Sequence, residues 1–114
     1  MAERARTGRK RFFQGTHRIC HPGETLARLR PRLGALGITR VADITGLDYV
    51  GIPVAMSVRP QALGLTVQQG KGLTLEAAKV SAIMESVESH CAQRNSPSPL
   101  WASLDRLEAG DVAL

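Results

Sequence analysis

The chain has 114 residues, enough for one domain at most, and a formal net charge of +5. Apolar residues make up 43% of it but aromatic residues only 4%, so any core is thin and built from Val, Leu, Ile and Ala. Two cysteines are too few for a disulfide scaffold, and no apolar run is long enough for a signal or transmembrane segment. We therefore expect a reduced, cytoplasmic protein that has no membrane partner.

The first 14 residues carry most of the charge, with five basic side chains against one acidic. The other hundred residues are close to neutral. High charge and the lack of apolar periodicity predict a disordered basic arm over residues 1–14. Such an arm could bind RNA or the ribosome electrostatically. Phe12 and Phe13 alone do not make a stacking platform, however, so a nucleic acid is not the favoured partner.

Residues 15–37 are punctuated by Pro22 and Gly23, after which leucines recur at helical spacing from Glu24 onward. This pattern predicts a helix that is either kinked at Pro31 or begins later in the segment. The pairs Cys20-His21 and His90-Cys91 raise the question of zinc. Adjacent side chains diverge on a helix or a strand, and no metal-ligand spacing accompanies either pair, so zinc is not expected.

Three short segments rich in β-branched residues follow, at 38–46, 52–60 and 64–69. Turn-sized connections join them, which favours an antiparallel meander. A long helix is predicted to begin after Thr74 and to end before Asn95. The fold class is therefore α+β, with a small antiparallel sheet packed by helices.

The long helix carries Ser81, Glu85 and Glu88 at spacings of four and three, which places them on one stripe. The neighbouring stripe is predicted to be the buried face, and it consists of Val80, Met84, Val87 and Cys91. The two carboxylates should then lie at the edge of a core, where their repulsion calls for a cation. Mg²⁺ suits such oxygen ligands.

Gly70, Lys71 and Gly72 precede this helix and could accommodate phosphate, because glycines allow close approach and lysine adds charge. The spacing does not fit a Walker motif, since five residues separate Gly64 from Gly70. Taken singly, the tripeptide could be an ordinary turn and the two glutamates a solvated helix face. Their combination on one strand–loop–helix unit favours a nucleotide–Mg²⁺ site.

The blocks GITRVADITGLDYVGIPVAMSVRP, QGKGLT and SAIMESVE, in that order, resemble the amino-terminal part of a YcaO domain. The resemblance covers roughly residues 15–105, and the residues of these blocks are most similar to those of the YcaO group that works with a TfuA partner. It implies that residues 15–114 are the first part of an incomplete ATP-binding domain, a fragment of the larger YcaO α/β fold.

In that family a helix with the pattern S-x-x-x-E-x-x-E binds Mg²⁺ and the phosphates of ATP. The resemblance therefore implies that Ser81, Glu85 and Glu88 bind ATP, with both glutamates as Mg²⁺ ligands. A basic and a hydroxyl residue near the start of the domain match Arg18 and Thr25. Lys71 matches the G-K-G block, whose role is structural or phosphate-facing. No catalytic residue is assigned.

The implied reaction is activation of a peptide-backbone amide by phosphorylation, which leads to a thioamide or an azoline in a peptide or protein substrate. Two departures stand against it. Ser89-His90 follow Glu88, where the family commonly has a basic or aromatic residue, and the carboxylates found farther along a YcaO domain are missing. The chain alone is expected to be too short for activity, so whether it is an enzyme stays open.

The first alternative function is a non-catalytic, truncated module that acts as a binding or partner protein. Whether it is part of an enzyme or a truncated module, the chain would leave an apolar face exposed for the remainder of a YcaO domain or for a second copy. The second alternative is a small basic protein that binds RNA or the ribosome through its arm.

Overall fold

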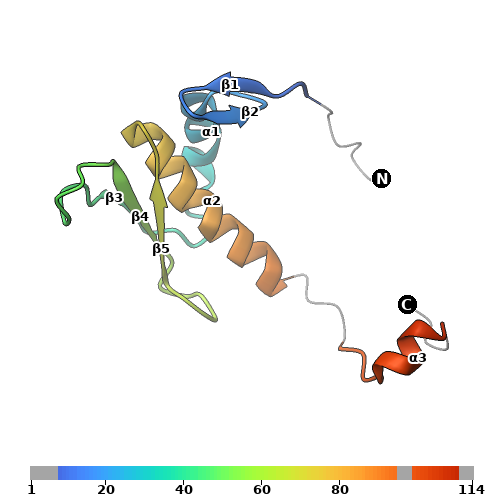
Figure 1. Ribbon diagram of the computed structural model, residues 1–114. Helices are drawn as coiled ribbons and strands as arrows, with labels where there is room; N and C mark the ends of the chain where they lie inside the picture. Colours follow the sequence, from blue (N-terminus) through green and yellow to red (C-terminus); the bar gives the residue numbers. More distant parts are fainter. Residues whose placement is uncertain (1–7, 95–98, 111–114) are drawn as a thin grey trace.

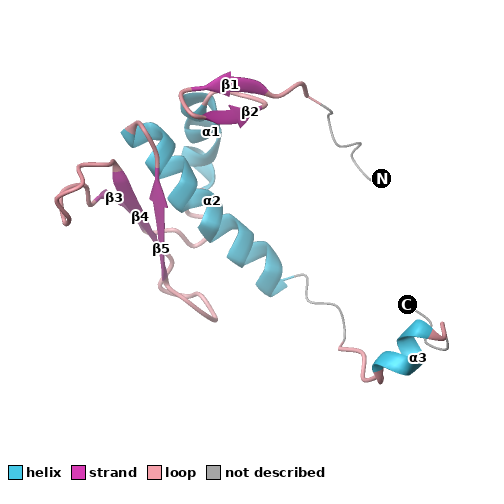
Figure 2. Cartoon of the chain, in the orientation of Figure 1, coloured by secondary structure: helices cyan, strands magenta, loops and turns pink. Residues whose placement is uncertain are grey.

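The computed structural model describes residues 8–94 and 99–110. Figures 1 and 2 show a long helix that lies against a three-stranded sheet, with a shorter helix and a separate hairpin near its start. In chain order the elements are β1 (Arg11–Phe13), β2 (Thr16–Arg18), α1 (Pro22–Leu29), the 3₁₀ turn η1 (Arg30–Arg32), β3 (Arg40–Asp43), β4 (Val54–Val58), β5 (Val67–Lys71), α2 (Leu75–Arg94) and α3 (Leu104–Glu108).

The three-stranded sheet is the predicted antiparallel meander, in the order β3-β4-β5. Along β4, Ala55 and Ser57 are fully buried beneath α2, while the alternate residues on the other face are partly exposed. One face of the sheet is thus covered by α2, and the small α+β fold is confirmed. Pro31 does not kink a longer helix, because α1 ends at Leu29 and Pro31 lies in the 3₁₀ turn η1.

The core is divided between the two sides of α2. Toward α1 it consists of Leu26, Ile38, Val80 and Ile83, and toward the sheet it consists of Ala55, Ala78 and Ala82. The predicted buried stripe is wrong for Met84, which is 43% exposed, and for Cys91, which is also exposed. The helix is rotated because its small residues face the sheet, and a pattern built on large apolar residues does not register them.

Gly70 is the reason that α2 can lie so close to β5. A Cβ at this position would collide with the backbone of Ala78 and Ala82 and would lie 2.7 Å from the carbonyl carbon of Ser81. Gly72 has the same role one turn earlier, where a Cβ would lie 2.6 Å from the Cβ of Ala77. β5 includes Gly70 and Lys71, so the strand ends two residues later than predicted.

Polar side chains fix the other end of α2. The Arg59 guanidinium, only 7% exposed, donates to the carbonyl oxygens of Leu36 (3.1 Å) and Ser86 (3.3 Å) and lies 3.1 Å from Nδ1 of His90. The Ser86 hydroxyl donates to the Ser57 hydroxyl at 2.9 Å. β4, α2 and the turn after η1 are therefore joined by buried hydrogen bonds. Burial and the neighbouring Arg59 and Arg94 lower the pKa of His90.

The hairpin β1–β2 corrects the prediction of a disordered arm over residues 1–14. Residues 1–7 lie outside the described part, but Arg11–Phe13 form a strand that pairs with Thr16–Arg18. The turn between them has positive φ at Gln14 (37°) and Gly15 (85°), as a two-residue hairpin turn requires. Phe12 and His17 lie across from each other, with ring centroids 5.4 Å apart.

Within the described residues, α3 contacts no other helix or strand (Figure 1). None of the helices in residues 8–94 and 99–110 has the length and apolar content needed to cross a bilayer.

Candidate functional site

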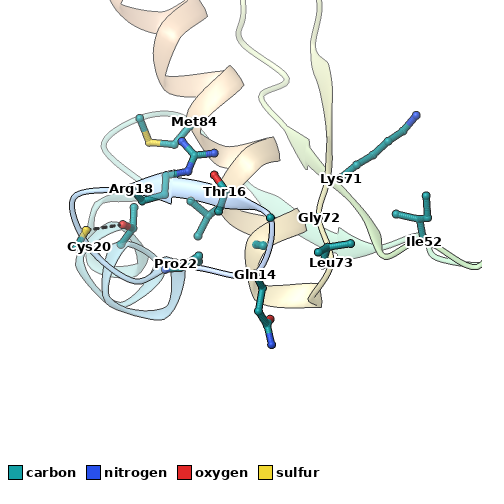
Figure 3. Close-up of a pocket in the computed structure, with 14 residues that line it drawn as sticks. Gln14, Thr16, Arg18, Cys20, Pro22, Ile52, Lys71, Gly72, Leu73 and Met84 are labelled. Atoms are coloured by element: carbon teal, nitrogen blue, oxygen red, sulfur yellow. Dashed lines mark hydrogen bonds between the residues drawn. The ribbon is translucent and has the colours of Figure 1, made fainter. Parts of the chain in front are cut away.

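A cavity of about 440 Å³ opens between the hairpin, the start of α1, the end of β5 and the first turns of α2 (Figure 3). Three of the six predicted site residues line it, although they come from three different elements: Arg18 from β2, Thr25 from α1 and Lys71 from β5. The structure therefore brings together side chains that lie up to 53 residues apart in the sequence.

These three residues do not face the cavity in the same way. In Figure 3 the Arg18 side chain lies toward Met84 of α2. The Thr25 hydroxyl is half-buried and lies 3.2 Å from the Cys20 sulfur. Lys71 is exposed and pairs with Val54, on the sheet face opposite α2, and its ammonium points away from the cavity. Arg18 and Thr25 are thus placed for a ligand in the cavity, whereas the Lys71 ammonium is not.

Ser81, Glu85 and Glu88 lie beside the cavity rather than in its lining. Ala77 and Met84 line it, and helical spacing places Ser81 one turn beyond Ala77 and Glu88 one turn beyond Met84. Both glutamates are exposed, so the expectation that they lie at the edge of a core is wrong. Within the described residues neither carboxylate is engaged in a hydrogen bond or an ion pair.

The Gly70–Gly72 segment has a packing role that the sequence did not reveal. Both glycines serve the close contact between β5 and α2, and the start of α2 is capped by Thr74, whose hydroxyl accepts from the Ala77 N–H at 3.1 Å. One of the backbone N–H groups that have no partner within the helix, that of Ala77, therefore already has an acceptor.

The cavity also contains residues that sequence reasoning missed. Thr16 adds a hydroxyl, while Ile52, Leu73 and Met84 supply apolar surface. Thr16 could have been found from Gln14-Gly15 between two β-prone pairs, which is a hairpin signal. Met84 was assigned to the core, so its exposure beside Arg18 was unexpected. Among the described residues no group of three or more His, Cys, Asp or Glu side chains is arranged so that it could hold a metal ion.

Comparison with known proteins shows what this chain is similar to. Residues 69–114 match the YcaO family model, described as YcaO cyclodehydratase, ATP- and Mg²⁺-binding. A solved structure of YcaO from Methanopyrus kandleri, bound with AMPPCP and Mg²⁺, matches with a TM-score of 0.60 and 30% identity. That match covers 82% of this chain and 27% of the other.

Two curated relatives match most of this chain. An uncharacterised protein of Mycobacterium tuberculosis is 51% identical over 96 residues, which is 83% of this chain and 22% of that protein. A protein of Rhizobium leguminosarum bv. trifolii, named for its position in the tfuA 3′ region, is 41% identical over 85% of this chain and 23% of its own length. The resemblance to part of a YcaO domain is confirmed by the family model and the solved structure, and the chain spans about a fifth of the length of these two curated relatives.

Proposed function

We propose that residues 15–114 form the amino-terminal part of an ATP-binding domain and hold ATP and Mg²⁺ in a YcaO-type enzyme. The observation that carries this proposal is the cavity between the hairpin, α1, β5 and α2. Arg18 and Thr25 line it, and the stripe of Ser81, Glu85 and Glu88 begins one helical turn away. Its volume of about 440 Å³ is in the range of small-molecule sites.

The polar and apolar parts of the cavity suit the two halves of a nucleotide. Ile52, Leu73 and Met84 offer apolar surface for a base, and Leu73 is 67% exposed, so it is free to cover a ligand. Arg18 supplies a guanidinium whose fork matches phosphate oxygens, and Thr25 supplies a hydroxyl.

Glu85 and Glu88 fit Mg²⁺ by the chemistry of their donor atoms. Two exposed carboxylates three residues apart, neither of them paired with another described residue, offer hard oxygen ligands together with the Ser81 hydroxyl on the same stripe. They are too few for a complete shell, which Mg²⁺ commonly fills with phosphates and water. When bound, the metal neutralises charge on the phosphates.

The whole reaction that we propose is ATP-dependent activation of a peptide-backbone amide, leading to a thioamide or an azoline, with a TfuA-like partner. It is supported by the family match and by the relative named for the tfuA region. This chain's part is to bind and orient the nucleotide. The residues that act on the peptide are proposed to lie in the rest of such a protein.

The test is thermal unfolding with and without Mg·ATP for wild type, Glu85→Gln and Glu88→Gln. Wild type should be stabilised, because a ligand that binds only the folded state raises the free energy of unfolding. Each Gln variant should lose that gain. Without ligand, each should be as stable as wild type or more stable by a fraction of a kcal/mol (~0.3), since like charges repel at i, i+3.

Glu76→Gln is the matched control, because Glu76 is an exposed glutamate of the same helix on another face. It should keep the full Mg·ATP response. No Mg·ATP response in wild type would contradict the proposal, as would Gln variants at 85 and 88 that respond in full.

A further inference from the structure

The hairpin places two arginines directly opposite each other. Arg11 pairs with Arg18 across β1 and β2, and directly opposed residues of an antiparallel pair project from the same face. Thr16 and Arg18 line the cavity, so this face is the one turned toward it. Arg11 is not in the lining, but it projects from the same face of the hairpin as Arg18.

The position of Arg11 is held by an aromatic ring. Its guanidinium carbon lies 5.5 Å from the ring centroid of Phe13, two residues along the same strand face. The Phe13 ring in turn packs edge-on against His21, with centroids 5.4 Å apart. A guanidinium over a ring keeps its N–H edge free for other partners, because the ring contacts only its flat side.

The charge of the hairpin is not balanced locally. Residues 8–20 contain three arginines and a lysine but no Asp or Glu. Both Arg11 and Arg18 are exposed, and in the part of the chain that the structure describes neither forms an ion pair. Like charges directly opposite in a sheet are unfavourable. An anion between them would turn that repulsion into an attraction.

We propose that Arg11 and Arg18 together bind one oxoanion at the mouth of the cavity, namely a phosphate of the nucleotide's polyphosphate chain. The identification of the anion rests on the proposed function, whereas the pairing of the two arginines does not. Each guanidinium can offer two parallel N–H donors to phosphate oxygens, and neighbouring strands bring the two within reach of one group. Arg11 is thus a phosphate-binding residue in addition to those found from sequence.

Titration calorimetry of the whole chain with sodium tripolyphosphate, without Mg²⁺ and at low salt, tests the pair. Wild type should bind one tripolyphosphate. Arg11→Gln and Arg18→Gln should each weaken binding about tenfold, the effect of one charge-assisted contact. Arg11→Lys keeps the charge but loses the planar fork, so it should show a smaller but measurable loss.

Lys10→Gln is the matched control. It removes the same charge from the residue that precedes β1, and the hollow that Lys10 lines with His17 and Ile19 shares Arg18, Cys20 and Thr25 with the cavity but does not include Arg11. It should weaken binding no more than about twofold, which is the screened effect of a nearby charge. NMR spectra of the backbone amides check that each variant is folded. Removing one of two repelling arginines should not unfold the hairpin.

Wild-type affinity in Arg11→Gln would overturn the inference, as would an equal loss in Lys10→Gln. The proposed function fails separately. If tripolyphosphate binding depends on the arginines but Mg·ATP stabilises nothing, the anion site stands and the nucleotide assignment falls. If Mg·ATP stabilises the chain and Arg11→Gln leaves both responses unchanged, the nucleotide assignment stands and the arginine pair is wrong.

Discussion

The two faces of α2 differ in the residues they use. Toward the sheet the helix presents Ala78, Ala82 and Ser86, all fully buried, and they meet Ala55, Ser57 and a glycine. The outer face presents Met84, Glu85 and Glu88, which are exposed. Small residues set how closely the helix lies against the sheet, and the outer face carries exposed apolar and charged residues. The predictions below test this division.

Gly70→Ala should have the largest effect. The added methyl would collide with α2 backbone, which cannot rotate away as a side chain can. We expect a loss of about 3 kcal/mol in the free energy of unfolding, the upper part of the usual overpacking range, measured by urea denaturation.

Gly34→Ala is the control for this substitution, because a Cβ there would meet nothing within 4 Å. It should leave stability unchanged or raise it by up to about 1 kcal/mol. A Gly70→Ala variant as stable as Gly34→Ala would show that α2 can shift, and the inner face would not be the fixed one.

Arg59→Met should cost somewhat less, about 2 kcal/mol, because the carbonyl groups of Leu36 and Ser86 lose their donor while the methionine still fills the space. Urea denaturation measures it. Arg40→Met, at an exposed position of β3, should change stability by no more than about 0.5 kcal/mol. Equal effects of the two would mean that the buried hydrogen bonds do not hold α2.

Asp43→Asn should have the smallest effect, and one that depends on pH. Hydrogen bonds from the Thr45 hydroxyl and backbone N–H lower the pKa of Asp43 from its ordinary 3.8, so the folded state favours the carboxylate. Its contribution to stability is present above pH 3.8 and is lost as the pH falls through the lower folded pKa. Thermal melts should show a gap between wild type and variant at pH 7 that closes toward pH 3.

The sheet and the long helix could be predicted because period-2 and helical patterns persist over enough residues in 38–69 and 75–94. The hairpin was missed because five basic residues in the first 14 outweighed a short β pattern around Gln14-Gly15. The rotation of α2 was missed because alanine and serine faces carry little hydrophobic signal. At the candidate site, the family pattern suggested Arg18 and Thr25 and a hairpin signal could have suggested Thr16, but only the fold could add Leu73 and Met84 to the same cavity.

The contact at Gly70 also determines which wall of the cavity can adjust. A strand and a helix that touch backbone to backbone have no rotamers between them, so β5 and the turn that carries Ser81 must move as one body. The opposite wall is the hairpin, whose backbone lies close to no other helix or strand in the described chain. The hairpin meets the start of α1 through side chains such as those of Phe13 and His21. A ligand would therefore be accommodated by movement of the hairpin, while the stripe of Ser81, Glu85 and Glu88 keeps its position relative to β5.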